Sequence, residues 1–529
     1  MIVVAFLIVL CSVLFGVYTL SKSKFDYWKK KNVPYKKPKP IVGNYGKFML
    51  FKRSLAEVAE DISREFPNEP YVGTFYGTEP ALLLRDPNFI KTVMTKDFYY
   101  FSSRENNKYS DKELFTQTIF ASGGDRWKVV RQNLTNIFTS AKMKAMFPLI
   151  GNCTKEFEAL LDKEFAKSNE LDAKYTMARF TMGCIGSCIF GVDTGTLTDR
   201  QKNEDNLFMT ILDLTKSIRS NILIFMFYFR AIWPRIFYAL GLRGFNPKLL
   251  KYLYDMVTGV FKSRDYKPSN RNDFIDMLLE FAKDKYITGD SLTNMKTGEN
   301  KKVRLEVNDD LLVAQCIVMF VAGFETSATT SSFVLYELAK NQEAQKKAQA
   351  EVDSYLKKHN GKVGYECTSE LPYLEACIDE ALRLYPVLGI LTREVVEDYT
   401  FPNGLQLEAG GRVHIPVRYL HRSPEFFPEP EKYKPERFLN GNKKDIVPHT
   451  YMPFGEGPRT CIGMRFAKMQ MLPGLITILK KYNVELADGI PTTPELDPLS
   501  VVVSTSHGIR VNCTLRSGWE TREFTDFVK

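Results

Sequence analysis

The residue with the clearest chemical potential is Cys461, in the stretch PFGEGPRTCIGMRFAKMQ at residues 453–470. Gly455, Gly457 and Pro458 predict a tight turn that brings backbone amides close to its sulfur. A run with helical spacing follows, and a helix N-terminus favours a thiolate. A single thiolate with no second sulfur or imidazole nearby suits haem iron better than zinc or an iron–sulfur cluster. For this cysteine taken alone, a buried structural role is the commoner situation.

The full pattern around the cysteine resembles the FxxGxRxCxG signature of the cytochrome P-450 superfamily of haem-thiolate monooxygenases. The matching residues are Phe454, Gly457, Arg459, Cys461 and Gly463. On this resemblance, Cys461 is the axial ligand of the iron in haem b, iron protoporphyrin IX, and Phe454, Arg459 and Gly463 also bind the cofactor.

A second motif precedes the cysteine on a predicted helix. Glu380 and Arg383 in EACIDEALRLYP are spaced i, i+3, which by itself is typical of a surface ion pair. Further on, YKPERF supplies Arg437. These residues resemble the family's ExxR helix and the arginine that completes its buried network. The resemblance implies that the network fixes the loop that presents the cysteine.

A long apolar helix is predicted after the cap-like residues 308–310. Within it, Ala322, Gly323, Glu325 and Thr326 resemble the family's oxygen-binding motif. Gly323 weakens a helix, and Thr326 can bond back to a carbonyl one turn earlier. Together they would open a groove for dioxygen and water, with Thr326 and Glu325 managing protons. A threonine-rich core helix is the alternative for this motif alone.

Candidate partners for the haem propionates come from a WxxxR pair and from separate arginines. Trp127 and Arg131 are spaced i, i+4, so both side chains can reach one anionic group, unless they form an exposed helix face. The resemblance adds Arg393 and Arg459, and Arg104 as a further ligand.

The resemblance also implies an apolar substrate pocket around the haem. The candidate pocket residues are Phe320, Ala322, Val387, Leu388, Leu391 and Val503. The linker sequence WKKKNVPY and the motif AGFETSATT resemble those of microsomal insect cytochromes P-450 that metabolise foreign compounds. The implied activity is insertion of one oxygen atom from O2 into lipophilic compounds such as plant toxins, insecticides or steroids.

Electrons must come from another protein, because the chain contains no dinucleotide GxGxxG motif of its own. The resemblance implies an NADPH-dependent reductase, with cytochrome b5 as a further candidate donor. Two rival functions stay open: an isomerase or dehydratase of the same fold that acts on peroxides without a reductase, and a haem-binding membrane protein without turnover.

Positioning these residues requires a mainly α-helical fold, which in this family is a triangular prism with a small β-rich region. Strand-like alternation occurs in YVGTFYG, ALLLRD, SVVVSTS and GIRVNCTL. The polar stretch at residues 283–310 is predicted to be a loop, and a helix is predicted to be capped near Asn272. The apolar segment 221–241 is interrupted by Pro234, so it predicts either a core helix or a segment dipping into a membrane surface.

The first 20 residues carry no charge and match the length of a membrane-spanning helix. Eight lysines follow between positions 22 and 39, so we expect a retained anchor with the rest of the chain in the cytosol, at the endoplasmic reticulum membrane. The expected domains are an anchor at residues 1–21, a basic, proline-rich linker at 22–44, and a catalytic domain at 45–529.

Composition agrees with a cytosolic, ordered protein. Of 529 residues, 44% are hydrophobic and 25% charged, and the nine cysteines are scattered rather than arranged as a secreted disulfide framework. The net charge of +10 owes much to the basic linker, which favours contact with membrane lipid over nucleic acid, for which no motif is present. A monomer is expected.

Overall fold

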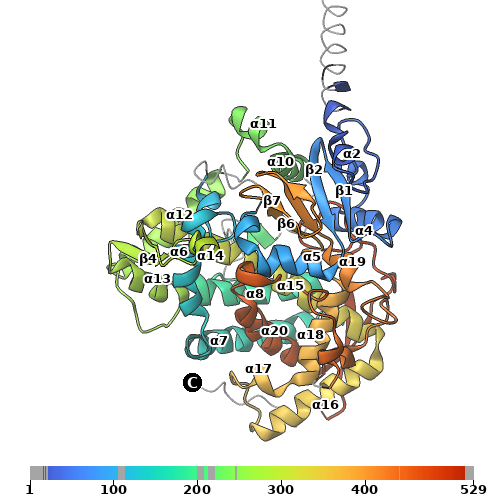
Figure 1. Cartoon of the computed structure of the whole chain (residues 1–529). Coiled ribbons are helices and arrows are strands. Elements are labelled where there is room, and N and C mark those ends of the chain that lie inside the picture. The colour runs from blue at the N-terminus through green and yellow to red at the C-terminus, as the bar shows by residue number, and fades with distance from the viewer. Residues whose placement is uncertain are drawn as a thin grey trace, which may run out of the picture.

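The structure is a computed structural model. It describes residues 16, 18–19, 22–104, 113–198, 206, 208–212, 221–244, 247–439 and 441–518. Most of the expected N-terminal anchor therefore lies outside the described residues. Helices dominate and four small sheets accompany them, which confirms the mainly α class (Figure 1).

The α-helices are numbered in chain order. Their bounds are α2 (Tyr27–Lys30), α3 (Gly46–Met49), α4 (Leu55–Glu65), α5 (Pro87–Lys91), α6 (Gly124–Thr135), α7 (Ser140–Phe165), α8 (Ala173–Ile185), α10 (Asn221–Ile232), α11 (Pro234–Ala239), α12 (Pro247–Ser263), α13 (Phe274–Ala282), α14 (Asn294–Thr297), α15 (Asp309–Lys340), α16 (Gln342–Lys358), α17 (Cys367–Glu370), α18 (Pro372–Leu384), α19 (Val417–His421) and α20 (Met464–Leu479).

The strands are short. They are β1 (Tyr71–Tyr76), β2 (Glu79–Leu84), β3 (Glu170–Asp172), β4 (Tyr286–Asp290), β5 (Lys302–Glu306), β6 (Leu391–Glu394), β7 (Tyr399–Thr400), β8 (Gln406–Leu407), β9 (Arg412–Ile415), β10 (Tyr482–Leu486) and β11 (Arg510–Leu515). The largest sheet has the order β1-β2-β9-β6, and a three-stranded sheet has the order β10-β11-β3.

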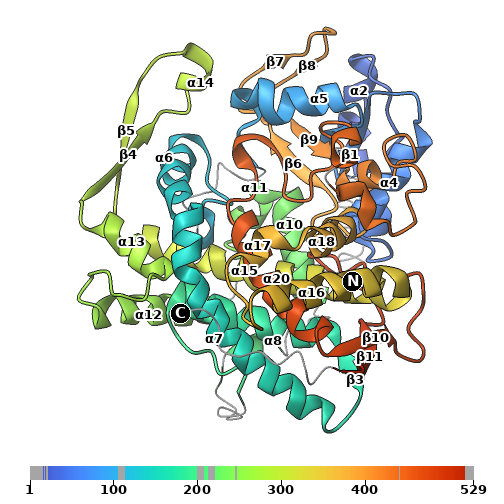
Figure 2. The same ribbon diagram turned by 90° about the horizontal axis from the view of Figure 1, so that it is seen from below.

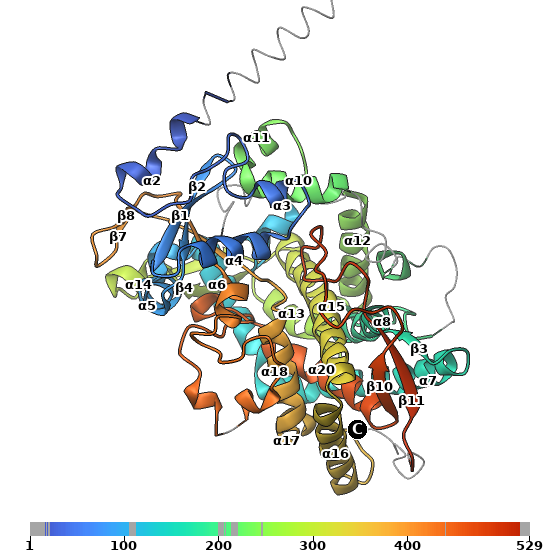
Figure 3. The ribbon, with the colours of Figure 1, turned by 90° about the vertical axis from the view of Figure 1, so that its right-hand side faces the viewer.

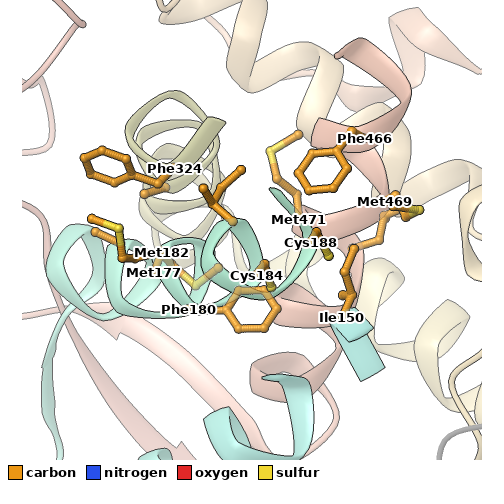
Figure 4. Packing of buried hydrophobic residues seen from close by; sticks show 14 of the residues in the cluster. Ile150, Met177, Phe180, Met182, Cys184, Cys188, Phe324, Phe466, Met469 and Met471 are labelled. Carbon is orange, nitrogen blue, oxygen red and sulfur yellow. The ribbon is translucent and has the colours of Figure 1, made fainter. Parts of the chain in front are cut away.

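The core is built around α15, which begins where Asn308 caps it: the Asn308 Oδ1 accepts the N–H of Leu311 at 2.9 Å. This helix is apolar on most sides and packs against α8, α18 and α20 (Figure 3). Figure 4 shows buried side chains of α8, α15 and α20 in one cluster. By length and composition it is the one described helix that could cross a membrane. However, 67% of its most apolar window is buried, so it serves as the central core helix.

Two predicted elements differ from the structure, and one predicted helix cap lies close to its expected position. Residues 286–306 form the hairpin β4–β5, with α14 at its tip, rather than a loop, because Ile287, Val303 and Leu305 alternate with polar residues and pack on the core (Figure 2). The SVVVSTS run is in no strand: the Val503 N–H bonds instead to the Val387 carbonyl at 3.2 Å. The cap of α13 is Asp273, one residue after the predicted position.

Three of the predicted strands, two near the start of the chain and one near its end, are found as expected. YVGTFYG and ALLLRD pair as the antiparallel hairpin β1–β2, and GIRVNCTL contains β11. The proline-rich segment after the expected anchor packs on this first hairpin. The Trp28 side chain is buried, its indole N–H donates to the Thr74 carbonyl at 2.8 Å, and Tyr35 bridges to Gly73.

Candidate active site

Cys461 lies in the loop between a 3-10 turn at Gly457–Arg459 and helix α20. Its N–H donates to the Phe454 carbonyl at 2.8 Å, which closes the turn. Gly457 has φ +68°, and a Cβ there would lie 1.8 Å from the Met94 carbonyl oxygen, so the turn requires glycine. The sequence therefore folds into a rigid loop that sets the sulfur just before a helix N-terminus.

Cys461 is accessible, unlike the other described cysteines, but its sulfur lies deep enough among protein atoms for desolvation to act on it. Burial raises the pKa of its thiol, while the Gly463 N–H and the guanidinium groups of Arg131 and Arg104 lower it. The helix N-terminus alone therefore does not offset the effect of burial on the pKa of this thiol. The helix end by itself does not explain how Cys461 would be held as a thiolate. A bound metal does, since a coordinating thiol is deprotonated outright.

Four arginines converge near this sulfur. Arg104 and Arg131 affect the Cys461 pKa directly, and burial together with the charges of Arg104, Arg393 and Arg131 lowers the pKa of Arg459. The pKa of Arg393 falls to about 9, because of burial and then Arg104. Within the described residues, none of the four pairs with a protein carboxylate. Such a cluster of cations calls for an anionic ligand.

The hydrogen bonds of these arginines show which ones also hold the loop. Arg131 Nη1 donates to the carbonyl of Thr460, the residue before Cys461, at 2.9 Å. Arg459 donates to the carbonyls of Ser102 at 2.6 Å and Ser122 at 2.7 Å, so it ties two chain segments together besides facing the cluster. Arg393 has a buried Nε with no hydrogen-bond partner in the described chain.

Trp127 and Arg131 share helix α6, as the WxxxR pattern predicts. The Trp127 ring is buried beneath Arg459, whose guanidinium carbon lies 4.4 Å from the ring centroid. Arg104 lies in the same way over Phe120, at 4.2 Å, and donates to its carbonyl at 2.7 Å. All five predicted propionate partners therefore lie within one connected region.

These residues fit a haem group. The cluster offers one sulfur ligand and several cationic donors, whereas the described residues contain no group of three or more His, Cys, Asp or Glu side chains suited to a protein metal site. In addition, a Cβ on Gly463 would meet no atom within 4 Å, so the backbone beside the sulfur is open to a flat ring.

The central helix presents a narrow stripe to this region. Val321 and Ala322 are exposed in the middle of a mostly buried helix, and Glu325 and Thr326 lie on the same side as Ala322, half-buried. The Thr326 hydroxyl donates to the Ala322 carbonyl at 2.6 Å, as expected. Glu325 lies 3.7 Å from the Lys174 ammonium of α8. This ion pair is not visible in the sequence, since its partners are far apart along the chain.

Gly323 faces the other way. A Cβ there would lie 2.4 Å from Cδ1 of Ile185, so this glycine lets α15 approach α8 closely. Its carbonyl accepts from the Gln470 side chain of α20 at 2.9 Å. Gly323 therefore positions the helix, and the expected widening of a groove is not the role its geometry supports.

A cavity of about 290 Å³ adjoins the arginine cluster. Arg104 and Arg393 lie in its wall, as do four of the predicted pocket residues: Val387, Leu388, Leu391 and Val503. Phe320 is not among the lining residues. It is 2% exposed, and its ring packs in tilted contacts against Phe190 and Phe324. Ala322 belongs to the exposed stripe rather than to the cavity wall.

The ExxR residues form a fully buried ion pair. Arg383 Nε and Nη2 donate to the two carboxylate oxygens of Glu380 at 2.7 and 2.8 Å, and Arg437 Nε reaches Glu380 at 3.4 Å. The arginines also donate to backbone carbonyls, Arg383 to that of Pro430 at 2.7 Å and Arg437 to that of Pro428 at 2.6 Å. The network thus clamps the long segment that leads to the cysteine loop.

Comparison with known proteins agrees with this geometry. The cytochrome P-450 family model matches residues 33–512. Cytochrome P-450 6k1 of Blattella germanica is 34% identical over 507 residues, which is 95% of each chain. Cytochrome P-450 6B1 of Papilio polyxenes is 35% identical over 519 residues, covering 97% of this chain and all of the relative. Cytochrome P-450 6B7 of Helicoverpa armigera is 33% identical over 509 residues, or 96% and 98% of the two chains.

Members of this family bind haem b through a cysteine thiolate and act as monooxygenases. In this chain, the one described cysteine with an exposed side chain lies at the start of α20 beside four clustered arginines. The match spans most of the chain, and it contains the motifs around Trp127, Thr326, Glu380 and Cys461. The chain therefore belongs to the cytochrome P-450 family of haem-thiolate monooxygenases.

Proposed function

We propose that this monooxygenase inserts one oxygen atom from O2 into lipophilic foreign compounds, such as plant toxins, insecticides or steroid-like molecules, by hydroxylation, epoxidation or dealkylation. The observation that carries the proposal is the cavity beside the arginine cluster, whose wall includes the apolar side chains of Val387, Leu391 and Val503. The volume of this cavity suits a small apolar molecule. The relatives compared above are insect proteins.

Cys461 would hold the haem iron on one side, and Arg104, Arg131, Arg393 and Arg459 would neutralise its propionates. Trp127 supports Arg459 from below, while Phe454 and Gly463 shape the backbone against the ring. When bound, the haem supplies oxygen activation, with the thiolate favouring cleavage of the O–O bond.

On the opposite side, the stripe of α15 would handle protons. The Thr326 hydroxyl is held by the Ala322 carbonyl, so its oxygen lone pairs remain oriented toward the open side of the helix as acceptors. Glu325 is oriented by its ion pair with Lys174. We assign Thr326 to the immediate hydrogen-bonding role and Glu325 to the supply of protons from the surface.

Electrons would come from an NADPH-dependent reductase, with cytochrome b5 as a second candidate. Candidate basic residues on α6 and α20, the helix that follows Cys461, are Arg126, Lys128, Arg465 and Lys468. Lys468 pairs with Glu375 at 2.5 Å and with Asp379 at 3.3 Å, so its charge is already compensated. Lys128 and Arg465 are the better candidates for contact with an acidic partner surface.

We further propose an endoplasmic reticulum membrane location, with the domain boundaries 1–21, 22–44 and 45–529 and a monomeric catalytic unit in the cytosol. Exposed apolar side chains support a membrane-facing end: Phe225 and Ile236, each 51% exposed, and Leu240, 64% exposed, lie on or next to α10 and α11. Leu50 adds to them, because α3 shares a core cluster with Ile232 and Trp233. Figure 1 shows α10 and α11 at the end where the described chain begins.

Reconstitution with a reductase tests the function. The expected result is NADPH consumption coupled to an oxygenated product for at least one lipophilic compound that shifts the iron spin state. A peroxide isomerase or dehydratase would turn over without NADPH, and a haem-binding protein without activity would show neither. The glycine, acid and threonine of the central helix motif favour the monooxygenase.

A further inference from the structure

Within the part of the chain that the structure describes, no side chain of the buried network of Glu380, Arg383 and Arg437 forms a hydrogen bond to the cysteine loop. Among the described residues, its hydrogen bonds end on the carbonyls of residues 421, 428, 429, 430 and 432 and on the N–H of Lys434. All of these precede the loop that runs from residue 449 to Cys461. Another group must therefore connect the network to the loop.

His421, the last residue of α19, is placed to make that connection. Its carbonyl accepts from Arg383 Nη1 at 2.8 Å, and its side chain is fully buried. The ring nitrogen Nε2 lies 2.9 Å from the backbone nitrogen of Met452 and accepts its N–H. One residue thus contacts the network through its backbone and the cysteine loop through its ring.

The contact continues along the loop by short backbone hydrogen bonds. The Met452 carbonyl accepts from the Gly455 N–H at 2.9 Å, and the carbonyl of Phe454 accepts from the Cys461 N–H at 2.8 Å. Gly455 has φ +72°, so the turn between these bonds is sharp. The orientation of the Met452 peptide therefore bears directly on where the sulfur is held.

Stacking fixes the His421 ring in this position. The Tyr451 ring stacks on it with 5.1 Å between centroids, and the Tyr451 hydroxyl donates to the Asp379 carbonyl of α18 at 2.8 Å. The imidazole is consequently clamped between α18 and the loop. Only a neutral ring with its proton on Nδ1 can accept at Nε2.

The charges around the ring favour that neutral form. Burial, and then the neighbouring Arg383 guanidinium, lower the pKa of His421 to about 3. Contacts of the ring with the backbone of Leu382 and Arg383 act weakly in the opposite direction. Glu380 is the nearest acidic side chain of the network, but it is occupied by Arg383.

We propose that His421 is a positioning residue for the haem ligand: its ring carries the constraint from the Glu380–Arg383 network to the peptide of Met452, and so holds Cys461 in register with the iron. The proposal rests on Cys461 being the haem ligand and is independent of the proposed substrate class. It names an acceptor atom, Nε2, rather than the bulk of the ring, as the part that matters.

Two substitutions separate the acceptor from the bulk. His421→Phe keeps a ring of similar shape without an acceptor, and His421→Gln keeps an acceptor near the position of Nε2. Leu356→Ala, a buried truncation in α16, serves as a control for general loss of stability. Each variant is purified with its haem, and three properties are compared: haem content, thermal stability, and the lifetime of the thiolate-type Soret band in the reduced, CO-bound form.

We expect the thiolate-type band of His421→Phe to decay roughly tenfold faster than that of the unmodified protein, because a buried N–H is left without an acceptor. His421→Gln should restore most of the lifetime, and Leu356→Ala should lower thermal stability without accelerating the decay. A normal lifetime in His421→Phe, or equal decay in the Phe and Gln variants, would overturn the proposal.

Hydrogen exchange on the unmodified protein supplies a test that needs no variant. The Met452 amide should be strongly protected in the haem-loaded protein, since its acceptor is a buried nitrogen. Exchange of this amide at the rate of an open loop would show that the His421 contact does not exist in solution, even if His421→Phe failed to fold.

Discussion

The Thr326 hydroxyl lies at a position where it adds little to the stability of helix α15. Its bond to the Ala322 carbonyl offers the backbone an alternative partner rather than stabilising the helix. The side chain nevertheless lies on the exposed stripe of α15, beside Glu325. A polar group placed at a site where it contributes little to stability is best explained by what it does there.

We predict that Thr326→Ala lowers the yield of product per NADPH by roughly tenfold or more, because a hydrogen-bonding group for proton delivery is lost. Thermal stability should hardly change. Product and peroxide are measured in the reconstituted system. Thr330→Ala is the matched control, since Thr330, one turn further along α15, makes the same bond, to the Thr326 carbonyl at 2.9 Å, but is buried. Equal losses in both variants would remove Thr326 from the proposed role.

At the scale of single residues, motif spacing in the sequence predicts which residues form the site better than it predicts which groups they contact. Trp127, Arg131 and Cys461 lie together as expected, since local periodicity and turn glycines decide their placement. The backbone bonds of Arg459 and the Glu325–Lys174 pair could not be predicted, because they depend on which distant segments pack beside them. No local pattern carries that information.

Secondary-structure elements hold the site in place at a few points where two backbone segments lie in close contact. The cysteine turn crosses the segment that ends at Lys96, where Gly457 meets the Met94 carbonyl. On α6, the residues that face the β4–β5 hairpin are Asp125, Gln132 and Asn133, which bond to Leu292, Asp290 and Thr288, while Trp127 and Arg131 face the site. The hairpin thus braces one face of the helix whose other face carries Trp127 and Arg131 beside the cysteine loop (Figure 2).

We predict that Gly457→Ala destabilises the fold by clearly more than the left-handed backbone penalty of about 1–2 kcal/mol, because a Cβ would also lie 1.8 Å from a carbonyl oxygen. Gly404→Ala is the matched control: its φ is +86°, but no atom lies within 4 Å of the added Cβ. Thermal unfolding of the two variants gives the comparison. Equal losses would mean that the contact with Met94 is not as close as described.

The β4–β5 hairpin shows why an element can be missed in a sequence. Its strands carry many charged residues, and strand alternation over five residues is easily hidden by a polar composition. By contrast, the long helix α15 and the strands β1 and β2 were predictable, because a strong apolar pattern and clear turn residues mark them. Gly323 was predictable as an unusual residue, but only the packing of α15 on α8 reveals its purpose.

At the scale of the whole molecule, some cationic side chains lie in the interior, where loss of hydration costs free energy of folding. Lys480, at the end of α20, is 3% exposed and pairs with Glu158 of α7 at 2.5 Å. Burial lowers the pKa of Lys480 from its ordinary value of 10.5 to about 8, even though Glu158 acts in the opposite direction. In the unfolded chain the lysine keeps its ordinary pKa. The unfolded state therefore binds more protons between about pH 8 and pH 10.5.

It follows that Lys480 makes the fold more stable as the pH rises through this window, by up to about 3 kcal/mol. We expect the unmodified protein to gain stability relative to Lys480→Met between pH 8 and pH 10.5, as measured by thermal unfolding. Lys357→Met, an exposed lysine in α16, controls for loss of a charge. A constant difference between the unmodified protein and Lys480→Met across the window would contradict the assignment.

Over the whole chain, the central claim is that Cys461 binds haem iron as a thiolate. The absorbance spectrum of the reduced, CO-bound protein tests it most directly. We predict a thiolate-type Soret band in the unmodified protein and its loss in Cys461→Ser, with the fold retained in both. A folded, haem-loaded protein without this band, or persistence of the band in Cys461→Ser, would contradict the account.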